Sequence, residues 1–425
     1  MKILCGPSNS KLGRLRKDDL RCILYGSAEN SSQGSAGGSI LKHVQHLKLS
    51  PVPRAWDLLS LALSVICADT AVRRGDSPDG WTRQIALKVA VSDPDFWTAH
   101  RLLIEDQLKF LTTDVWELEF TGYGLYPKPP KVPKFPDSDC VALLSGGLDS
   151  FVGAIDLVAD GKNPFAVSQV AAGDKQSQAE FAAKIGAGLD HLQLNHNVKC
   201  PGENDRSQRA RSFIFLAYGV LAASALKRYK DGERVDLYMC ENGLISINPP
   251  LTPARLGSLS TRTTHPVFLG LFQELLDVAE LRITVRNPYQ FKTKGEMLSE
   301  CKDQAFLRKH AAETTSCGRY ARNGWQHCGR CLPCLIRRAA FHAWGEADKT
   351  QYVYADLSKN DPQHARYDDV RCAAMAAALV DAEGLDALAT TNLNALAMGD
   401  LSPYRDLLTR GIKEVGQFLT AAGVR

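Results

Sequence analysis

The strongest indication of a fold in this chain is the stretch Val141-Ala142-Leu143-Leu144-Ser145-Gly146-Gly147-Leu148-Asp149-Ser150. Its first four residues predict a short strand of the kind that is buried in a parallel sheet. The two glycines let the backbone approach a ligand closely and adopt φ > 0 without steric cost. A helix is predicted from about residue 149 to residue 160. This strand–loop–helix order predicts an anion-binding turn, because amides of the loop and of the first helical turn point at the ligand.

The polar side chains of this loop predict that the anion is part of ATP. Ser145 and Ser150 supply hydroxyl donors, whereas Asp149 would repel phosphates unless it binds a Mg²⁺ ion that bridges them. A Walker-type loop is absent from the sequence, so the site is predicted to hold the pyrophosphate that leaves when AMP is transferred. The predicted ATP-binding residues are Ser145, Gly146, Gly147, Leu148, Asp149 and Ser150, and Asp149 and Ser150 are also candidate catalytic residues. The alternative is a tight turn without a ligand.

The rest of the chain divides into segments around this loop. After it, predicted strands alternate with helices, a pattern that indicates an α/β fold with a doubly wound parallel sheet. Residues 126–137 contain five prolines and predict a stiff linker. The predicted units are an N-terminal α+β domain over 1–125, this linker, a loop-bearing domain over 138–345 and a helical C-terminal extension over 346–425.

The bulk composition is that of a globular protein. The 425 residues favour two or three domains. With 51 basic and 47 acidic residues, the net charge of +4 gives no support to a nucleic-acid partner. There is no uncharged apolar run of membrane-spanning length, and the apolar stretch at the N-terminus is too short for a signal peptide. We therefore expect a cytoplasmic protein.

Four of the 12 cysteines are clustered in the sequence and predict a metal site. Cys317, Cys328, Cys331 and Cys334 have a spacing that suits tetrahedral Zn²⁺. An iron–sulfur cluster remains an alternative. A closed set of four thiolates leaves no position for water, so a structural metal is expected. The other cysteines are scattered, and most are expected to be buried thiols: Cys5, Cys22, Cys67, Cys140, Cys200, Cys240, Cys301 and Cys372.

The loop sequence resembles the signature Ser-Gly-Gly-x-Asp-Ser of the PP-loop ATP pyrophosphatases. In that family the motif usually continues with Ser or Thr, where this chain has Phe151, which removes one hydroxyl donor. The loop followed by Cys-x₁₀-Cys-x₂-Cys-x₂-Cys resembles QueC, the 7-cyano-7-deazaguanine synthases, over roughly residues 138–345. This resemblance implies ATP-dependent adenylation of the carboxylate of 7-carboxy-7-deazaguanine, followed by formation of an amide or a nitrile.

Further segments are similar to QueC and imply the remaining site residues. Arg211 and Ser212 open a long predicted helix and are expected to bind an anionic group. Lys292 and Lys294 are candidate catalytic residues that neutralise charge on the phosphates. The other candidates for substrate binding are Glu241, Asn242, Gly243 and His265; His265 is also a candidate general base. Each has a structural alternative: a solvated helix start, a polar turn, or lysines that face solvent.

The extra length resembles the longer QueC-like proteins of the Qat and CBASS anti-phage systems, most clearly around Trp56 and over residues 111–120. In such proteins the acceptor of the activated carboxylate is ammonia or an amine of a partner protein, and the added domain suits partner recognition. Two other functions stay open. One is a tRNA-modifying PP-loop enzyme, and the other is a scaffold that senses nucleotide without catalysis.

Overall fold

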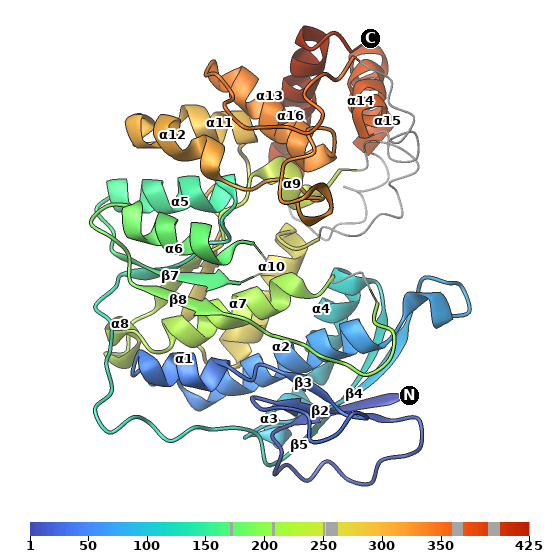
Figure 1. Cartoon of the computed structure of the whole chain (residues 1–425), viewed down its shortest axis with the longest axis vertical. Coiled ribbons are helices and arrows are strands. Elements are labelled where there is room, and N and C mark those ends of the chain that lie inside the picture. Colours follow the sequence, from blue (N-terminus) through green and yellow to red (C-terminus); the bar gives the residue numbers. More distant parts are fainter. Residues whose placement is uncertain are drawn as a thin grey trace.

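The computed structural model describes residues 1–170, 173–205, 209–249, 251, 262–358, 369–389 and 400–424. Two five-stranded sheets with helices around them form the lower and middle parts of the molecule in Figure 1. Every strand pairing within the two sheets is parallel. The first sheet has the order β3-β2-β1-β4-β5 and the second β10-β9-β6-β7-β8. In each sheet the first strand in sequence therefore lies in the centre. The next two strands extend the sheet on one side of it, and the last two extend it on the other side.

The first sheet is built from the N-terminal part of the chain. Its strands are β1 (Lys2–Gly6), β2 (Leu20–Leu24), β3 (Gly34–Ala36), β4 (Gln84–Ala90) and β5 (Val115–Thr121), and its helices are α1 (Ile40–His46), α2 (Pro53–Ala71), η1 (Arg74–Asp76), α3 (Pro94–Ala99) and α4 (Arg101–Thr112). The expected α+β organisation is wrong here, because the strands pair in parallel and the unit is α/β. Alternating residues predict a strand but not the direction of its partner, which the crossover helices decide.

The second sheet confirms the predicted doubly wound α/β fold. Its strands are β6 (Cys140–Leu143), β7 (Pro164–Gln169), β8 (His191–Leu194), β9 (Val235–Tyr238) and β10 (Ile283–Arg286). Its helices are α5 (Leu148–Ala159), α6 (Lys175–Lys184), α7 (Arg211–Ala223), α8 (Lys227–Lys230), α9 (Gly243–Ile247), α10 (Pro266–Val278) and α11 (Lys294–Ser299). Strand β8 was not predicted, because four residues that include His191 and Gln193 carry little hydrophobic signal. The predicted helix start at 207 lies outside the described residues.

The two sheets share one hydrophobic core. Helix α2 is buried at every position from 55 to 70, including the polar residues Asp57, Ser60, Ser64, Asp69 and Thr70, so it lies in the core between the two sheets. It packs against α7 of the second unit, and a single cluster of buried side chains includes residues of both sheets. The N-terminal unit is therefore not self-contained, although the proline-rich segment 126–137 forms neither helix nor strand.

The C-terminal region is helical, as expected. It comprises α12 (Gln304–His310), η3 (Ala311–Glu313), η4 (Ala321–Asn323), α13 (Leu332–Trp344), α14 (Asp369–Glu383), α15 (Asp386–Ala389) and α16 (Ser402–Ala421). These helices lie at the opposite end of the molecule from the first sheet (Figure 1). Helix α16 packs against α9 and α13. The C-terminal helix thus supports α9, the helix that follows β9, as well as α13. None of the described helices combines the length and apolarity needed to cross a bilayer.

Candidate active site

The loop between β6 and α5 is a closed turn held by its own serines. Gly146 has φ = +87°, a conformation that favours glycine. Ser150 Oγ accepts from the Ser145 amide at 3.2 Å and donates to Gly147 O at 3.0 Å, while Ser145 Oγ accepts from the Gly147 amide at 3.2 Å. Both predicted hydroxyl groups therefore shape the loop, and α5 begins at Leu148 directly after it.

Two distant segments fix the loop from outside. Gln178 of α6 donates from Nε2 to Ser145 O and to Gln169 O, both at 3.1 Å. The Thr315 amide donates to Gly146 O at 3.0 Å. Neither residue was predicted, because each reaches the loop only through tertiary packing and carries no local sequence signal.

Asp149 lies at the centre of a buried charged group. Its Oδ1 forms an ion pair with Lys294 Nζ at 2.8 Å, and its Oδ2 accepts from the amide and Nδ2 of Asn242 at 3.1 and 2.7 Å. Burial alone would raise the pKa of Asp149, but the Lys294 ammonium and the hydrogen bonds from Glu241, Lys294 and Asn242 hold it well below its usual range. Asp149 is therefore ionised at neutral pH.

Glu241 is the second carboxyl group of this site. Burial and the neighbouring Asp149 carboxylate raise the pKa of Glu241 well above its usual value. Glu241 is thus protonated beside an ionised Asp149, as expected for two carboxyl groups that share one site. Such a pair suits a hard divalent cation, because an ion that binds both oxygens can replace the proton.

The two candidate lysines have different positions. Lys294 is 5% exposed and contacts Asp149 from the first turn of α11. The helix start is held by Glu414 of α16, which accepts from Thr293 Oγ1 at 2.5 Å and from the Gly295 amide at 3.1 Å. Lys292 instead forms an exposed ion pair with Glu300. Only Lys294 is brought to the loop.

A cavity of about 330 Å³ opens beside the loop at the carboxyl ends of β6, β7 and β9, where ligands bind in doubly wound folds. Its walls include apolar side chains as well as Ser212 Oγ and Thr264 Oγ1, which are buried and lack hydrogen-bond partners among the described residues. The lining residues are Leu143, Ser145, Ser150, Gln169, Asp174, Arg211, Ser212, Phe215, Met239, Cys240, Glu241, Thr263 and Thr264. Asn242 and Gly243 lie behind this lining, at the start of α9.

His265 is a buried helix cap. Its Nδ1 accepts from the Val267 amide at 3.2 Å at the start of α10, and its ring packs on Phe110, with 5.1 Å between the centroids. It is not among the residues that line the cavity. Burial, aided by the positive charge of Arg262, lowers the pKa of His265 to about 3.

We expect His265→Asn to weaken the dependence of stability on pH. The fold favours the neutral ring, so this contribution is complete above the unfolded pKa of about 6.5 and is lost as pH falls from there toward 3. At pH 5 the loss is about 2 kcal/mol relative to pH 7. Asparagine keeps a capping oxygen and does not titrate. Urea unfolding at pH 7 and pH 5 measures the difference for both proteins; equal differences would contradict the assignment.

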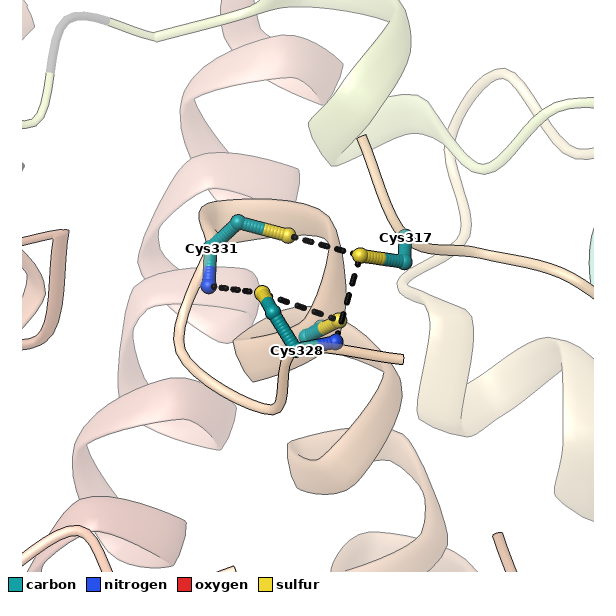
Figure 2. A group of neighbouring side chains, drawn as sticks. Cys317, Cys328 and Cys331 are labelled. Atoms are coloured by element: carbon teal, nitrogen blue, oxygen red, sulfur yellow. Dashed lines mark hydrogen bonds between the residues drawn. The ribbon is translucent and has the colours of Figure 1, made fainter. Parts of the chain in front are cut away.

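The four clustered cysteines converge on one point, and Figure 2 shows the thiols of Cys317, Cys328 and Cys331 directed toward one another. The sulfur atoms of Cys317 and Cys331 are 3.8 Å apart, and those of Cys328 and Cys334 are 3.9 Å apart. Backbone amides of Cys328 and Cys331 donate to neighbouring sulfur atoms at 3.3 and 3.2 Å. All four thiols are buried within one group. This geometry fits a structural zinc site, since four bonds of about 2.3 Å to a tetrahedral ion separate the sulfurs by about 3.8 Å.

The cysteine cluster is connected to the loop between β6 and α5. The segment that leads into Cys317 contains Thr315, the donor to Gly146 O, and Ser316, whose amide donates to His327 Nε2 at 3.1 Å. Arg337 of α13 binds the same segment through Thr314 Oγ1 at 2.9 Å and Ala311 O at 2.7 Å. A metal ion in the cluster would therefore hold in place the segment that closes the loop.

The two parallel sheets and this loop show an α/β fold that is consistent with a PP-loop domain. The family model described as "Queuosine biosynthesis protein QueC" matches residues 263–345, which include Lys294 and the four cysteines. The 7-cyano-7-deazaguanine synthase of Paracoccus denitrificans (strain Pd 1222) is 36% identical over 98 residues, 22% of this chain and 39% of the relative. The chain thus spans about two fifths of the length of that relative.

Longer matches extend the likeness at lower identity. The 7-cyano-7-deazaguanine synthase of Agrobacterium fabrum (strain C58 / ATCC 33970) is 25% identical over 242 residues, 51% of this chain and 93% of the relative. That of Brucella canis (strain ATCC 23365 / NCTC 10854 / RM-666) is 28% identical over 182 residues, 41% of this chain and 68% of the relative. Together these findings support a QueC-like PP-loop protein, in agreement with the resemblance of its motifs.

Proposed function

We propose that this protein uses ATP to activate the carboxylate of a 7-deazaguanine and then transfers the acyl group to an amine. The observation that carries the proposal is one shared cavity: the PP-loop serines, Glu241 and the Arg211–Ser212 helix start all border it. The names of the relatives supply the substrate class. In the first step a carboxylate oxygen bonds to the α-phosphorus as pyrophosphate leaves. In the second step the amine bonds to the acyl carbon, AMP leaves and the amine loses a proton.

The PP-loop and Lys294 would stabilise the charge that develops on the departing pyrophosphate. Amides of the first turn of α5 and the Ser145 hydroxyl would donate to the phosphates, Ser150 Oγ would exchange its bond to Gly147 O for one to a phosphate, and Lys294 adds a buried positive charge. Asp149 and Glu241 are the residues that would hold Mg²⁺, which when bound neutralises phosphate charge. Their contact, with one proton retained between two carboxyl groups, fits such an ion.

The walls of the cavity suit a flat heterocycle with polar edges. Phe215 and Met239 are apolar, and the unpartnered hydroxyl groups of Ser212 and Thr264 are available to a ligand. Arg211 lines the cavity and can bind the substrate carboxylate or a phosphate through its guanidinium. A volume of about 330 Å³ lies at the lower end of the range for small-molecule sites. Asn242 does not line the cavity; it orients Asp149 through the two hydrogen bonds that it donates to Oδ2.

We further propose that the acceptor is an amine of a partner protein and that the reaction serves anti-phage defence in the cytoplasm. The support is the additional N-terminal sheet: the alignment with the Agrobacterium relative uses nearly all of that protein but only half of this chain. A unit of this size suits the binding of a macromolecule better than the binding of ammonia. Ammonia remains the competing acceptor, with an amide or a nitrile as the product.

The proposal is tested by product analysis. Full-length protein is incubated with Mg-ATP and 7-carboxy-7-deazaguanine, alone, with ammonium, or with a protein encoded beside it. Mass spectrometry follows AMP, pyrophosphate and any amide, nitrile or protein adduct. Substrate-dependent AMP formation is expected, and the mass of the product identifies the acceptor. Failure to form AMP and pyrophosphate under all three conditions would overturn the proposal.

The two lysines provide a matched pair of variants. We expect Lys294→Met to lower kcat/KM for AMP formation about 100-fold, because a buried positive charge beside the PP-loop is lost. Lys292→Met should change it less than about threefold, since an exposed ion pair contributes little. Circular dichroism of both variants controls for folding. Equal losses in the two variants would remove Lys294 from the mechanism.

A further inference from the structure

A second group of cysteines lies in the N-terminal unit, far from the cluster at Cys317. The sulfur atoms of Cys5, Cys22 and Cys67 lie within 4.8 Å of one another, and all three residues are buried. Cys5 on β1 is directly opposite Cys22 on β2 in the parallel register, so both side chains point to the same face of the sheet. Helix α2 covers that face and contributes Cys67. The sequence predicted only separate core thiols here.

A fourth cysteine joins this group from the other unit. Residues Ser35 and Lys199 exchange two backbone hydrogen bonds of 2.8 and 2.9 Å, which hold the segment after β8 against β3. The next residue, half-buried Cys200, donates to Cys67 O at 3.7 Å; its sulfur lies beside the three that are mutually within 4.8 Å and is not one of them. The four thiols are thus contributed by β1, β2, α2 and the segment after β8.

Space for these sulfur atoms is kept open by Gly34 on β3. A Cβ atom at this position would lie 2.7 Å from Cys22 Sγ and 3.5 Å from Cys200 Sγ. The first distance is closer than packing allows, so a side chain here would displace the thiols. Glycine at position 34 therefore allows the thiols to lie close together, as expected for a compact set of metal ligands.

The arrangement matches the chemistry of thiophilic metal ions. Sulfur ligands of a tetrahedral ion lie about 3.8 Å apart when the metal–sulfur bonds are about 2.3 Å, and the three buried sulfurs fall within 4.8 Å. In the described part of the chain, only this group and the Cys317 cluster bring three or more candidate ligands together in this way. The half-buried position of Cys200 gives an ion access from solvent.

We propose that Cys5, Cys22, Cys67 and Cys200 form a second thiolate metal site that binds a zinc-class ion and fastens the N-terminal unit to the PP-loop unit. The site joins strands of the first sheet to the segment after β8. The same segment carries His196, whose carbonyl accepts from the Gly37 amide at 2.6 Å and whose Nδ1 contacts Gln169 Nε2 at 3.0 Å. Because Gln169 lines the nucleotide cavity, the ion would also help to set one wall of that cavity.

The test is the metal content of the full-length chain, which does not depend on enzymatic activity. The protein is produced in zinc-supplemented medium and dialysed, and ions per chain are measured by inductively coupled plasma mass spectrometry. Two ions per chain are expected, with all-sulfur coordination in X-ray absorption spectra. Cys22→Ser combined with Cys67→Ser should leave one ion, and so should Cys334→Ser in the other cluster.

Two further variants keep the test independent of misfolding. Cys200→Ser alters a half-buried ligand and should remove the second ion or lower its number of sulfur ligands. Cys372→Ser on α14, outside both clusters, should retain two ions. One ion in the unmodified protein that disappears in Cys334→Ser would overturn the proposal. Two ions with unchanged sulfur coordination in both the Cys22→Ser/Cys67→Ser variant and the Cys200→Ser variant would also overturn it.

Discussion

Asp149→Asn is expected to lower the formation of AMP and pyrophosphate about 1,000-fold, the upper range for loss of a single group that stabilises transition-state charge. The variant loses the charge that pairs with Lys294 at 2.8 Å and, with Glu241, half of the proposed Mg²⁺ site. Folding should survive, because asparagine has nearly the same size and keeps an oxygen that can accept from Asn242. Burial still raises the pKa of Glu241 in this variant, but the Asp149 charge that raises it further is gone, so this pKa should fall.

The matched control for this variant is Asp160→Asn at the end of the same helix. Asp160 is exposed and pairs only with Lys302 among the described residues, so its rate should change less than about threefold. Substrate-dependent release of pyrophosphate measures both variants. Activity of Asp149→Asn within tenfold of the unmodified protein would mean that Asp149 supports the loop without taking part in catalysis.

Cys334→Ser is expected to have the second large effect, on stability and on rate together. The side chain is completely buried, and loss of one of four ligands should release the ion or weaken its binding strongly, which removes the contribution of metal binding to folding. The Cys317 segment would then no longer hold Thr315 against Gly146 O. We expect one ion fewer per chain, a lower midpoint of thermal unfolding and at least a tenfold fall in AMP formation.

The comparison for this variant is Cys372→Ser, which should match the unmodified protein in metal content, unfolding midpoint and rate. A chelator offers a route without mutation: removal of the ion should lower the rate, and added Zn²⁺ should restore it. If Cys334→Ser loses its ion while AMP formation is unchanged, the cluster does not position the loop, and the link through Thr315 is wrong.

Much of the second unit could be predicted from short-range patterns. The strand, the glycine-containing turn and the helix around Ser145 are neighbours in sequence, so their local conformations define the loop. The spacing of Cys317 to Cys334 is equally local, because tight turns bring such thiols together. The position of Glu241 after a buried strand placed it at the ligand-binding edge of the sheet. The structure brings these features together.

Other features depended on contacts between distant segments. Lys292 and Lys294 are two residues apart in one loop, and only the start of α11, held by Glu414 from the C-terminal tail, directs Lys294 to Asp149. The burial of His265 as a helix cap against Phe110 required knowledge of how α4 and α10 pack. The parallel pairing of the first sheet followed from its crossover helices, because alternation along a strand carries no information about its partner.

The Ser145 loop, the cysteine string and the α/β alternation after residue 138 could therefore be predicted from the sequence alone, because each is encoded by residues close together along the chain. The shared core of the two sheets, the position of Lys294 rather than Lys292 at the loop and the proximity of Cys5, Cys22, Cys67 and Cys200 became apparent only in the folded structure. Strand register and helix packing set these relations, and both arise between residues that are far apart in sequence.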